Sequence, residues 1–274
     1  MTNMGQTAGN IQTGEMSFWE HLDVLRASLI KIVIATVLCG IVAFLFKEEV
    51  FSVILAPKND AFITYRLFNR IAGWITGAES SGFSVQLINT GLAEQFVIHM
   101  KTSVYIGFLF SSPYTLYLLF HFISPALYEN ERKYSFRVVG SGYAMFILGI
   151  LLSYFLIFPL TFRFLGTYQV SNDVANMITL QSYMGTLLMM CVLMGIVFEL
   201  PVLCWLLAKL GILSAEFMRH FRKHSIIVIL IISAIITPTS DIFTLSLVAL
   251  PIWMLYEVSI LIVGKSEKKT ITTI

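Results

Sequence analysis

Long apolar runs separated by short polar segments dominate the hydrophobic pattern of this chain. A membrane-spanning helix needs about 20 mostly apolar residues to cross about 30 Å of hydrocarbon. Four runs reach that length, and a C-terminal stretch is long enough for two shorter helices. The pattern predicts an all-α integral membrane protein, with one six-helix domain over residues 17–264. The predicted spans are residues 27–46, 103–123, 138–158, 184–207, 225–236 and 242–263.

The last two predicted spans are separated only by the segment TPTSD, Thr237 to Asp241. Proline cannot continue a helix, whereas threonine, serine and aspartate can turn the chain or cap the next helix. A single span interrupted by Pro238 is the competing interpretation, but it would be about twice as long as the bilayer requires. We therefore expect a hairpin of two short helices.

The long segment between the first two spans, residues 47–102, contains an aromatic stretch. Phe62, Tyr65, Phe68 and Trp74 favour an amphipathic helix that lies on the outer membrane surface. We expect that helix to cover the spans from outside.

The composition supports a membrane protein. Hydrophobic residues make up 57% of the 274 positions and charged residues 12%, whereas about 25% of a soluble domain is charged. The mean hydropathy is +0.81. The net charge of +2 is too small to argue for nucleic acid. The three cysteines, Cys39, Cys191 and Cys204, lie in apolar runs and are expected to be buried rather than paired in disulfides.

Basic residues predict the orientation, because they are enriched in cytoplasmic segments. With the N-terminus inside, inner segments hold eleven lysines and arginines and outer segments five, four of them in one long loop. Both termini and the polar segment SPALYENERK, residues 124–133, are thus predicted to be cytoplasmic. Residues 1–16 carry no signal peptide pattern and are expected to be disordered, with Met16 as an alternative start. Residues 265–274 are expected to be a short basic tail.

No catalytic motif is present: the sequence lacks H-E-x-x-H, G-x-S-x-G, a P-loop and G-x-G-x-x-G. His220 and His224 have a metal-ligand spacing, but cationic residues surround them, which favours a basic loop facing anionic lipid. We therefore expect no enzyme activity, no cofactor and no metal.

Glu199 is the most informative ionisable residue, because it lies inside a predicted span. A charge at the centre of a membrane helix costs about 2.5 to 3.5 kcal/mol on insertion scales. Pro201 has no N–H for the carbonyl of Val197, so we expect a kink and a polar notch beside the carboxylate. Glu199 is either a functional site or a structural residue that is protonated or paired with lysine. Glu257 raises the same question more weakly.

Six segments follow one another from about Ser17 to Val263: FWEHLDVLRASL, LAP, GLAEQF, SPALYENERK, FELP and TPTSDIF. Together they resemble the TatC family, the multispan receptor subunit of the twin-arginine protein translocase. The resemblance implies a cupped six-helix receptor in the inner (cytoplasmic) membrane that binds twin-arginine signal peptides of folded cargo. It also implies a homo-oligomer that contacts membrane lipid, TatA-type and, where present, TatB-type single-span partners, and export driven by the protonmotive force.

The resemblance also assigns the signal-peptide site. Glu131 matches the family's recognition glutamate, with Arg132 and Glu129 beside it. The family's second carboxylate precedes the first span, in a motif written here as HLDVLR, His21 to Arg26. Val24 stands at the carboxylate position. Asp23 or Glu20 substitutes for it, or Glu129 and Glu131 carry recognition alone; Asp23 and Arg26 are kept as candidates.

Three further assignments follow from the resemblance. Glu199 matches the buried glutamate on the concave face of the cup. Pro57 and Phe96 match positions that shape the periplasmic cap, where Asp241 is a further candidate for partner contacts or the N-cap of the last helix. Two other functions stay open: an ion-coupled small-molecule carrier that uses Glu199, and a passive membrane scaffold.

Overall fold

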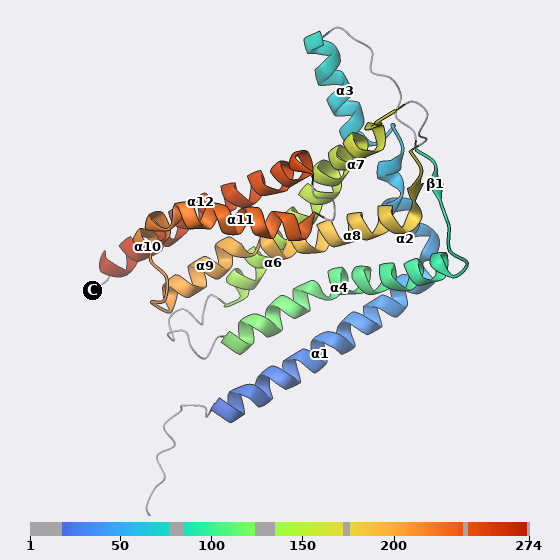
Figure 1. The fold of residues 1–274 in the computed structure, drawn as a ribbon. Coiled ribbons are helices and arrows are strands. Elements are labelled where there is room, and N and C mark those ends of the chain that lie inside the picture. The colour runs from blue at the N-terminus through green and yellow to red at the C-terminus, as the bar shows by residue number, and fades with distance from the viewer. Residues whose placement is uncertain (1–17, 77–84, 124–134, 172–175, 238–240, 273–274) are drawn as a thin grey trace, which may run out of the picture.

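The computed structural model describes residues 18–76, 85–123, 135–171, 176–237 and 241–272. Long helices run side by side along one axis, and most short elements gather at one end, with the short α10 (Ala215–His220) at the other (Figure 1). The helices are α1 (Phe18–Leu45), α2 (Lys47–Ile54), η1 (Ala56–Lys58), α3 (Ile63–Thr76), α4 (Glu94–Ile123), α6 (Ser135–Leu152), η3 (Ser153–Ile157), α7 (Phe158–Thr167), α8 (Leu180–Val197), α9 (Leu200–Lys209), α10 (Ala215–His220), α11 (Arg222–Ile236) and α12 (Ile242–Thr272). Two short strands, β1 (Leu87–Ile88) and β2 (Ile178–Thr179), pair in parallel.

Five helices or helix pairs within the described ranges are long and apolar enough to cross a membrane. They are Trp19–Leu45, Glu94–Ile123, Val138–Thr167, Leu180–Lys209 and Ile242–Glu267. The remaining predicted span, residues 225–236, corresponds to α11, whose 15 residues rise only about 22 Å. The predicted membrane fold is thus confirmed, with α11 as the short helix.

The last helix departs from the expectation. We expected both final helices to be short, but α12 has 31 residues. Residues 265–272, which we expected to form a tail, are part of this helix, so it continues past the end of the apolar run. The start of α1 and the C-terminal end of α12 lie at the same end of the bundle (Figure 1), as an even number of spans requires.

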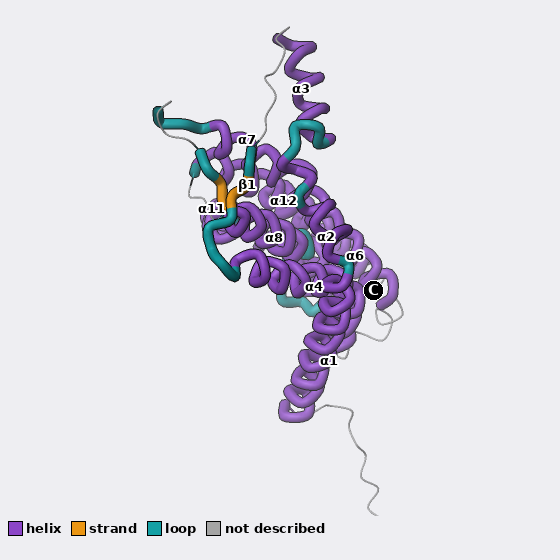
Figure 2. The backbone as a smooth tube through the Cα atoms, turned by 90° about the vertical axis from the view of Figure 1, so that its right-hand side faces the viewer, coloured by secondary structure: helices purple, strands orange, loops and turns teal. Residues whose placement is uncertain are grey.

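The core is built around α8. Met190 and Met194 have no exposed surface, and they pack in one cluster with Ile157, Val248 and Ile252. α1 lies at the edge of the bundle (Figure 2), where it packs mainly against α4. Its outward side chains are exposed, as expected of a helix that faces lipid on most of its surface.

Proline breaks the third span where the outer elements attach. Pro159 cannot donate to the carbonyl of Phe155, four residues earlier, and the chain forms the π-helical turn η3 just before it. The freed carbonyl of Phe155 accepts a hydrogen bond from the Thr64 hydroxyl of α3. The Tyr65 hydroxyl donates to the carbonyl of Pro159 at 3.1 Å. The break in the span is therefore the docking point of α3.

Two tyrosines hold the end of α2. The last carbonyls of a helix have no partner within it, and here those of Val53 and Ile54 accept from side chains of other helices. Tyr154 donates to Val53 at 2.5 Å, and Tyr183 donates to Ile54 at 2.9 Å. Tyr183 is 2% exposed, so water cannot replace this bond.

Tyr183→Phe is expected to destabilise the protein by about 1 to 3 kcal/mol, because it leaves the Ile54 carbonyl buried without this donor. Thermal unfolding of the purified protein in detergent measures the effect. Tyr143→Phe is the matched control, since Tyr143 is exposed and its change should leave the midpoint unaltered. Equal midpoints for the two variants would show that the Tyr183 hydroxyl does not hold α2.

Candidate functional site

A cavity of about 430 Å³ lies between α1, α4, α6 and the α8–α9 pair. Apolar side chains form most of its wall, including Leu29, Phe108, Phe146 and Leu206. Among the described residues that line it, Glu199 is the only ionisable one, and the hydroxyls of Ser112 and Thr115 add to the polar part of the wall. A membrane cavity with a carboxyl group in a mostly apolar wall suits an apolar ligand that carries a few polar groups.

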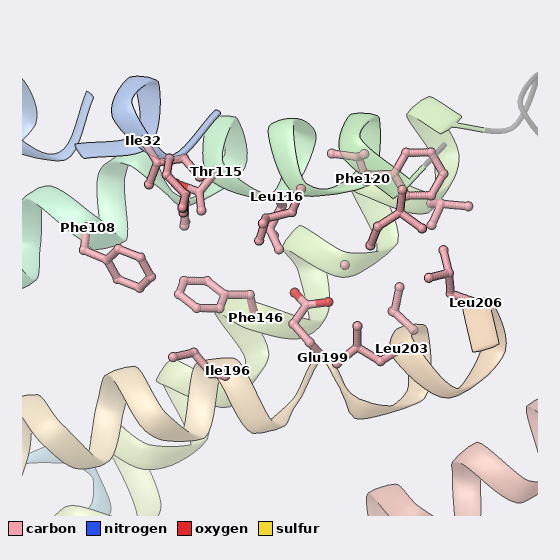
Figure 3. A pocket seen from close by; sticks show the side chains of 18 residues that line it. Ile32, Phe108, Thr115, Leu116, Phe120, Phe146, Ile196, Glu199, Leu203 and Leu206 are labelled. Carbon is pink, nitrogen blue, oxygen red and sulfur yellow. The ribbon is translucent and has the colours of Figure 1, made fainter. Parts of the chain in front are cut away.

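Glu199 lies at the break between α8 and α9. α8 ends at Val197 and α9 begins at Leu200, so the expected kink before Pro201 is present. The Glu199 carboxylate points from the break into the cavity, between Phe146 and Leu203 (Figure 3). The helix is interrupted where the acidic group enters the cavity.

The Glu199 side chain is almost enclosed, with 9% of its surface exposed, and its Oε1 atom accepts no hydrogen bond from the described residues. No ion pair with a lysine or arginine of the described ranges offsets its charge. The paired structural role is therefore not observed. A buried acceptor without a donor costs about 1 to 3 kcal/mol, which favours a group that binds something entering the cavity.

Gly142 of α6 faces this carboxylate. A Cβ atom at Gly142 would lie 3.0 Å from Oε2 of Glu199 and 3.5 Å from Oε1. The missing side chain thus leaves the space that the carboxyl group occupies. Sequence analysis did not identify Gly142, because nothing local distinguishes it from Gly140 in the segment GSG.

The predicted recognition residues Glu129, Glu131 and Arg132 lie outside the described residues. The elements that flank their segment are described, and both border the cavity. Ile123, the last residue of α4, and Val138, in the first turn of α6, line its wall. The described residues on either side of the segment that carries the predicted glutamates therefore lie beside the Glu199 cavity.

The first turns of α1 lie at the same end of the bundle. His21 stacks on Phe122, with ring centroids 4.1 Å apart. Asp23 and Arg26 are exposed, whereas Val24 is partly buried. Asp23 is therefore free to face a ligand at this end, and Val24 packs partly against the protein.

The three cap candidates lie at the opposite end. Pro57 is buried in η1, and Phe96, in the first turn of α4, is 60% exposed. Asp241 accepts a hydrogen bond from the Thr244 N–H at 2.7 Å, so it caps the N-terminus of α12. Nearby, the Glu94 carboxylate accepts from backbone N–H groups that include Gly91 at 2.8 Å.

The sequence matches the family model described as "Sec-independent protein translocase protein (TatC)" over residues 20–251. The chain belongs to the TatC family. The TatC protein of Blattabacterium sp. subsp. Periplaneta americana is 34% identical over 263 residues, which are 94% of this chain and 98% of that protein. The TatC protein of Aquifex aeolicus is 32% identical over 255 residues, 93% of this chain and 97% of that protein.

The fold agrees with solved structures of this TatC family. A crystal structure of the "Twin Arginine Translocase Receptor- TatC" matches with a TM-score of 0.71 and 32% identity, over 89% of this chain and 98% of that one. A second structure of that receptor, in DDM, gives a TM-score of 0.73 at 32% identity, over 88% and 98% of the two chains. The predicted family and cupped helical fold are confirmed.

The TatC assignment also decides between the functions that the sequence left open. The chain is a multi-pass membrane component of the twin-arginine translocase and not an enzyme, because the family is one of translocase receptors. The carrier interpretation of Glu199 is not favoured.

The structure explains the second intramembrane acid of this TatC protein differently. Glu257 of α12 accepts from Arg222, the first residue of α11, at 2.7 Å, and the pair is partly exposed. Tyr256 next to it donates to the Met218 carbonyl of α10 at 2.7 Å. Glu257 thus ties α12 to the start of α11, a structural role that only the tertiary fold reveals.

Proposed function

We propose that this chain is the cytoplasmic signal-peptide receptor of its translocase, and that the cavity of Glu199 receives part of the apolar segment of the signal. The observation that carries the proposal is that Ile123 and Val138, described residues on either side of the segment of Glu129 and Glu131, both line the cavity. A twin-arginine signal joins a cationic pair to an apolar segment, so its receptor needs carboxylates next to an apolar cavity.

Arginine suits recognition by carboxylates, because its planar guanidinium donates two parallel hydrogen bonds to one carboxylate. In the proposal Glu129 and Glu131 accept from the two arginines, while Arg132 and Arg26 orient the acids. Asp23, exposed on α1, supplies a further carboxylate. A single exposed ion pair contributes only about 0 to 1 kcal/mol, so selectivity requires several such groups.

Glu199 contributes a polar atom inside the cavity. Its Oε1 accepts no hydrogen bond from the described part of the chain, so it is available to an N–H group or a water molecule that enters with the signal. An acidic atom in the apolar wall favours local hydration and thinning of the bilayer. The short helix α11 supports such thinning.

The orientation and the partners belong to the same proposal. Eleven of the sixteen basic residues outside the spans fall on the side of both termini, which supports a cytoplasmic location for them in the inner membrane. The other end, with Pro57, Phe96 and Asp241, then faces the periplasm. TatA-type and TatB-type single-span subunits, and further copies of the chain, are the proposed partners.

The test is capture of a synthetic twin-arginine signal peptide by the purified full chain. We expect the double variant Glu129→Ala and Glu131→Ala to bind at least about tenfold more weakly, because it loses charged hydrogen bonds of about 1.5 to 3 kcal/mol each. A peptide with both arginines changed to lysine should bind the unaltered chain with a similar loss. Asp23→Ala measures how much the carboxylate on α1 contributes to peptide affinity.

Glu48→Ala with Glu49→Ala is the matched control, since these adjacent exposed glutamates of α2 lie at the opposite end. Its affinity should equal that of the unaltered chain. The assignment of recognition to this segment fails if the Glu129 and Glu131 variant binds as tightly as the control. The receptor proposal fails if the arginine and lysine peptides bind alike.

A further inference from the structure

The helix α3 presents an apolar stripe that no described part of the chain covers. Ile63, Leu67, Ile71 and Trp74 are 59%, 58%, 50% and 90% exposed. At 100° per residue, these four positions fall within an arc of about 80° on one face. Their exposure is therefore a continuous stripe along the helix and not a set of scattered side chains.

The opposite side of α3 is firmly attached to the bundle. Thr64 and Tyr65 are buried and donate to the carbonyls of Phe155, within η3, and of Pro159, just after η3. Arg163 of α7 donates to Asn69 at 3.0 Å and lies 5.8 Å from the ring centroid of Tyr65. Burial raises the pKa of the Tyr65 phenol well above its usual range, so its hydroxyl keeps its proton and its bond.

This attachment fixes the direction of the helix. α3 runs roughly across the axis of the long helices and projects beyond them, at the end that carries α2 and the two strands (Figure 1). A helix across the spans at their end runs along the membrane surface. Its first two turns bond to Phe155, Pro159 and Arg163, which lie toward the end of the third span, so α3 lies near that end of the span.

Two arginines lie along one edge of the stripe. Arg66 and Arg70 are exposed and one turn apart, and they border one edge of the apolar arc. The helix contains no aspartate or glutamate, and no ion pair of either arginine exists with a described residue. The charge of α3 is thus positive next to an exposed apolar surface.

We propose that α3 is a lipid-binding helix: its stripe enters the headgroup region of the leaflet at this end of the bundle, and Arg66 and Arg70 bind the phosphates of anionic phospholipids. Tryptophan is enriched at the membrane–water interface, which fits Trp74 at the tip. Basic residues near a membrane surface favour anionic lipid. α3 would then be held on two sides: the third span binds its buried side, and lipid binds its exposed side.

The test uses the full chain in vesicles of brominated phospholipid, which quenches tryptophan on contact. Trp74→Phe isolates the Trp74 signal, because the difference between the two proteins removes the contributions of the other three tryptophans. We expect the lipid to quench Trp74. Two vesicle types contain the same mixture of phosphatidylglycerol and phosphatidylcholine, and only one of the two lipids is brominated in each. Brominated phosphatidylglycerol should quench Trp74 about twofold more than brominated phosphatidylcholine.

Arg66→Gln with Arg70→Gln should abolish the preference for phosphatidylglycerol and retain quenching. Arg66→Lys with Arg70→Lys keeps the charge and should retain part of the preference. Both pairs lie on the exposed face, and unchanged unfolding midpoints verify that they fold. Absence of quenching by either lipid overturns the membrane contact, and equal quenching by both lipids overturns the recognition of anionic headgroups.

Discussion

Gly142→Leu is expected to abolish export of twin-arginine cargo while the protein still inserts in the membrane. The Cβ atom alone would lie 3.0 Å from Oε2 of Glu199, and the rest of the leucine would fill part of the 430 Å³ cavity. Either the carboxylate moves or α6 shifts away from the α8–α9 break. Both outcomes remove the space proposed for the signal, so we expect peptide affinity to fall at least about tenfold.

Gly140→Leu provides the matched control. Gly140 lies on the same helix two residues away, and a Cβ there meets no atom within 4 Å. Its leucine points away from the cavity, so export and peptide capture should remain close to those of the unaltered protein. Gly142→Ala adds only the Cβ atom and should give an intermediate loss.

Four measurements separate an effect on the cavity from general damage to the fold. Membrane insertion and the thermal midpoint report folding, peptide capture reports binding, and transport of a twin-arginine reporter reports export. A Gly142→Leu protein that folds, binds the peptide and exports as the Gly140→Leu control does would show that the cavity is not part of the receptor site.

The sequence predicts most of this fold because the membrane restricts the possible structures. Every backbone polar group inside the bilayer must be satisfied, so an apolar run of sufficient length is a helix. The predicted run 27–46 ends within one residue of α1, and the run 103–123 ends with α4 at Ile123. Their N-terminal boundaries were too late, because α1 and α4 begin in polar segments that hydropathy does not assign to a span.

The sequence also drew attention to Glu199, since a lone acid two residues before a proline is unusual in an apolar run, and the structure places it at the α8–α9 break in the cavity wall. Its surroundings could not be predicted. The spacing of Gly142 and Glu199, 57 positions apart, has no local signature, and their contact depends on how α6 crosses the α8–α9 pair. The pairing of Glu257 with Arg222 was missed for the same reason.

The outer elements illustrate a second limit. A helix was predicted around Tyr65, and α3 confirms that helix. The predicted membrane-facing side is only partly right, because Tyr65 is buried in the bundle and Phe62, just before the helix, packs against the core. One of the hydrogen bonds that attach α3 uses the Phe155 carbonyl, which Pro159 leaves free, and the sequence alone does not connect that carbonyl with Thr64. Likewise, the carbonyls at the end of α2 are bonded by tyrosines 101 and 129 positions away. Local patterns give the elements, and these distant bonds give their placement.

Gly107→Ala is expected to separate α1 from α4, although it adds one methyl group. A Cβ at Gly107 would lie 2.5 Å from the Thr36 carbonyl oxygen and 2.7 Å from Cα of Gly40. Both are backbone atoms that no rotamer change can move. Small residues at such crossings let membrane helices pack closely. Overpacking of this kind costs about 1 to 3 kcal/mol, so the thermal midpoint should fall.

Gly185→Ala is the control, and it is expected to leave stability unchanged or to raise it. A Cβ at Gly185 of α8 meets no atom within 4 Å, and alanine is favoured over glycine in a helix by about 1 kcal/mol. Gly185→Ala should therefore be neutral or stabilising. If both variants have the same midpoint, backbone contact at Gly107 does not hold the two helices together.

The α1–α4 contact also matters for the receptor site, because α1 contributes Leu29 to the cavity wall and carries Asp23 beside the end of α4. The two helices share a further bond at 3.0 Å between the hydroxyls of Thr36 and Ser111, near the Gly107 crossing. A displaced α1 would open the cavity and move Asp23 away from the end of α4. Gly107→Ala should consequently weaken peptide capture by more than its loss of stability, measured as the thermal midpoint, can explain. Tyr183→Phe, at the opposite end of the bundle, should lower stability and leave peptide capture unchanged.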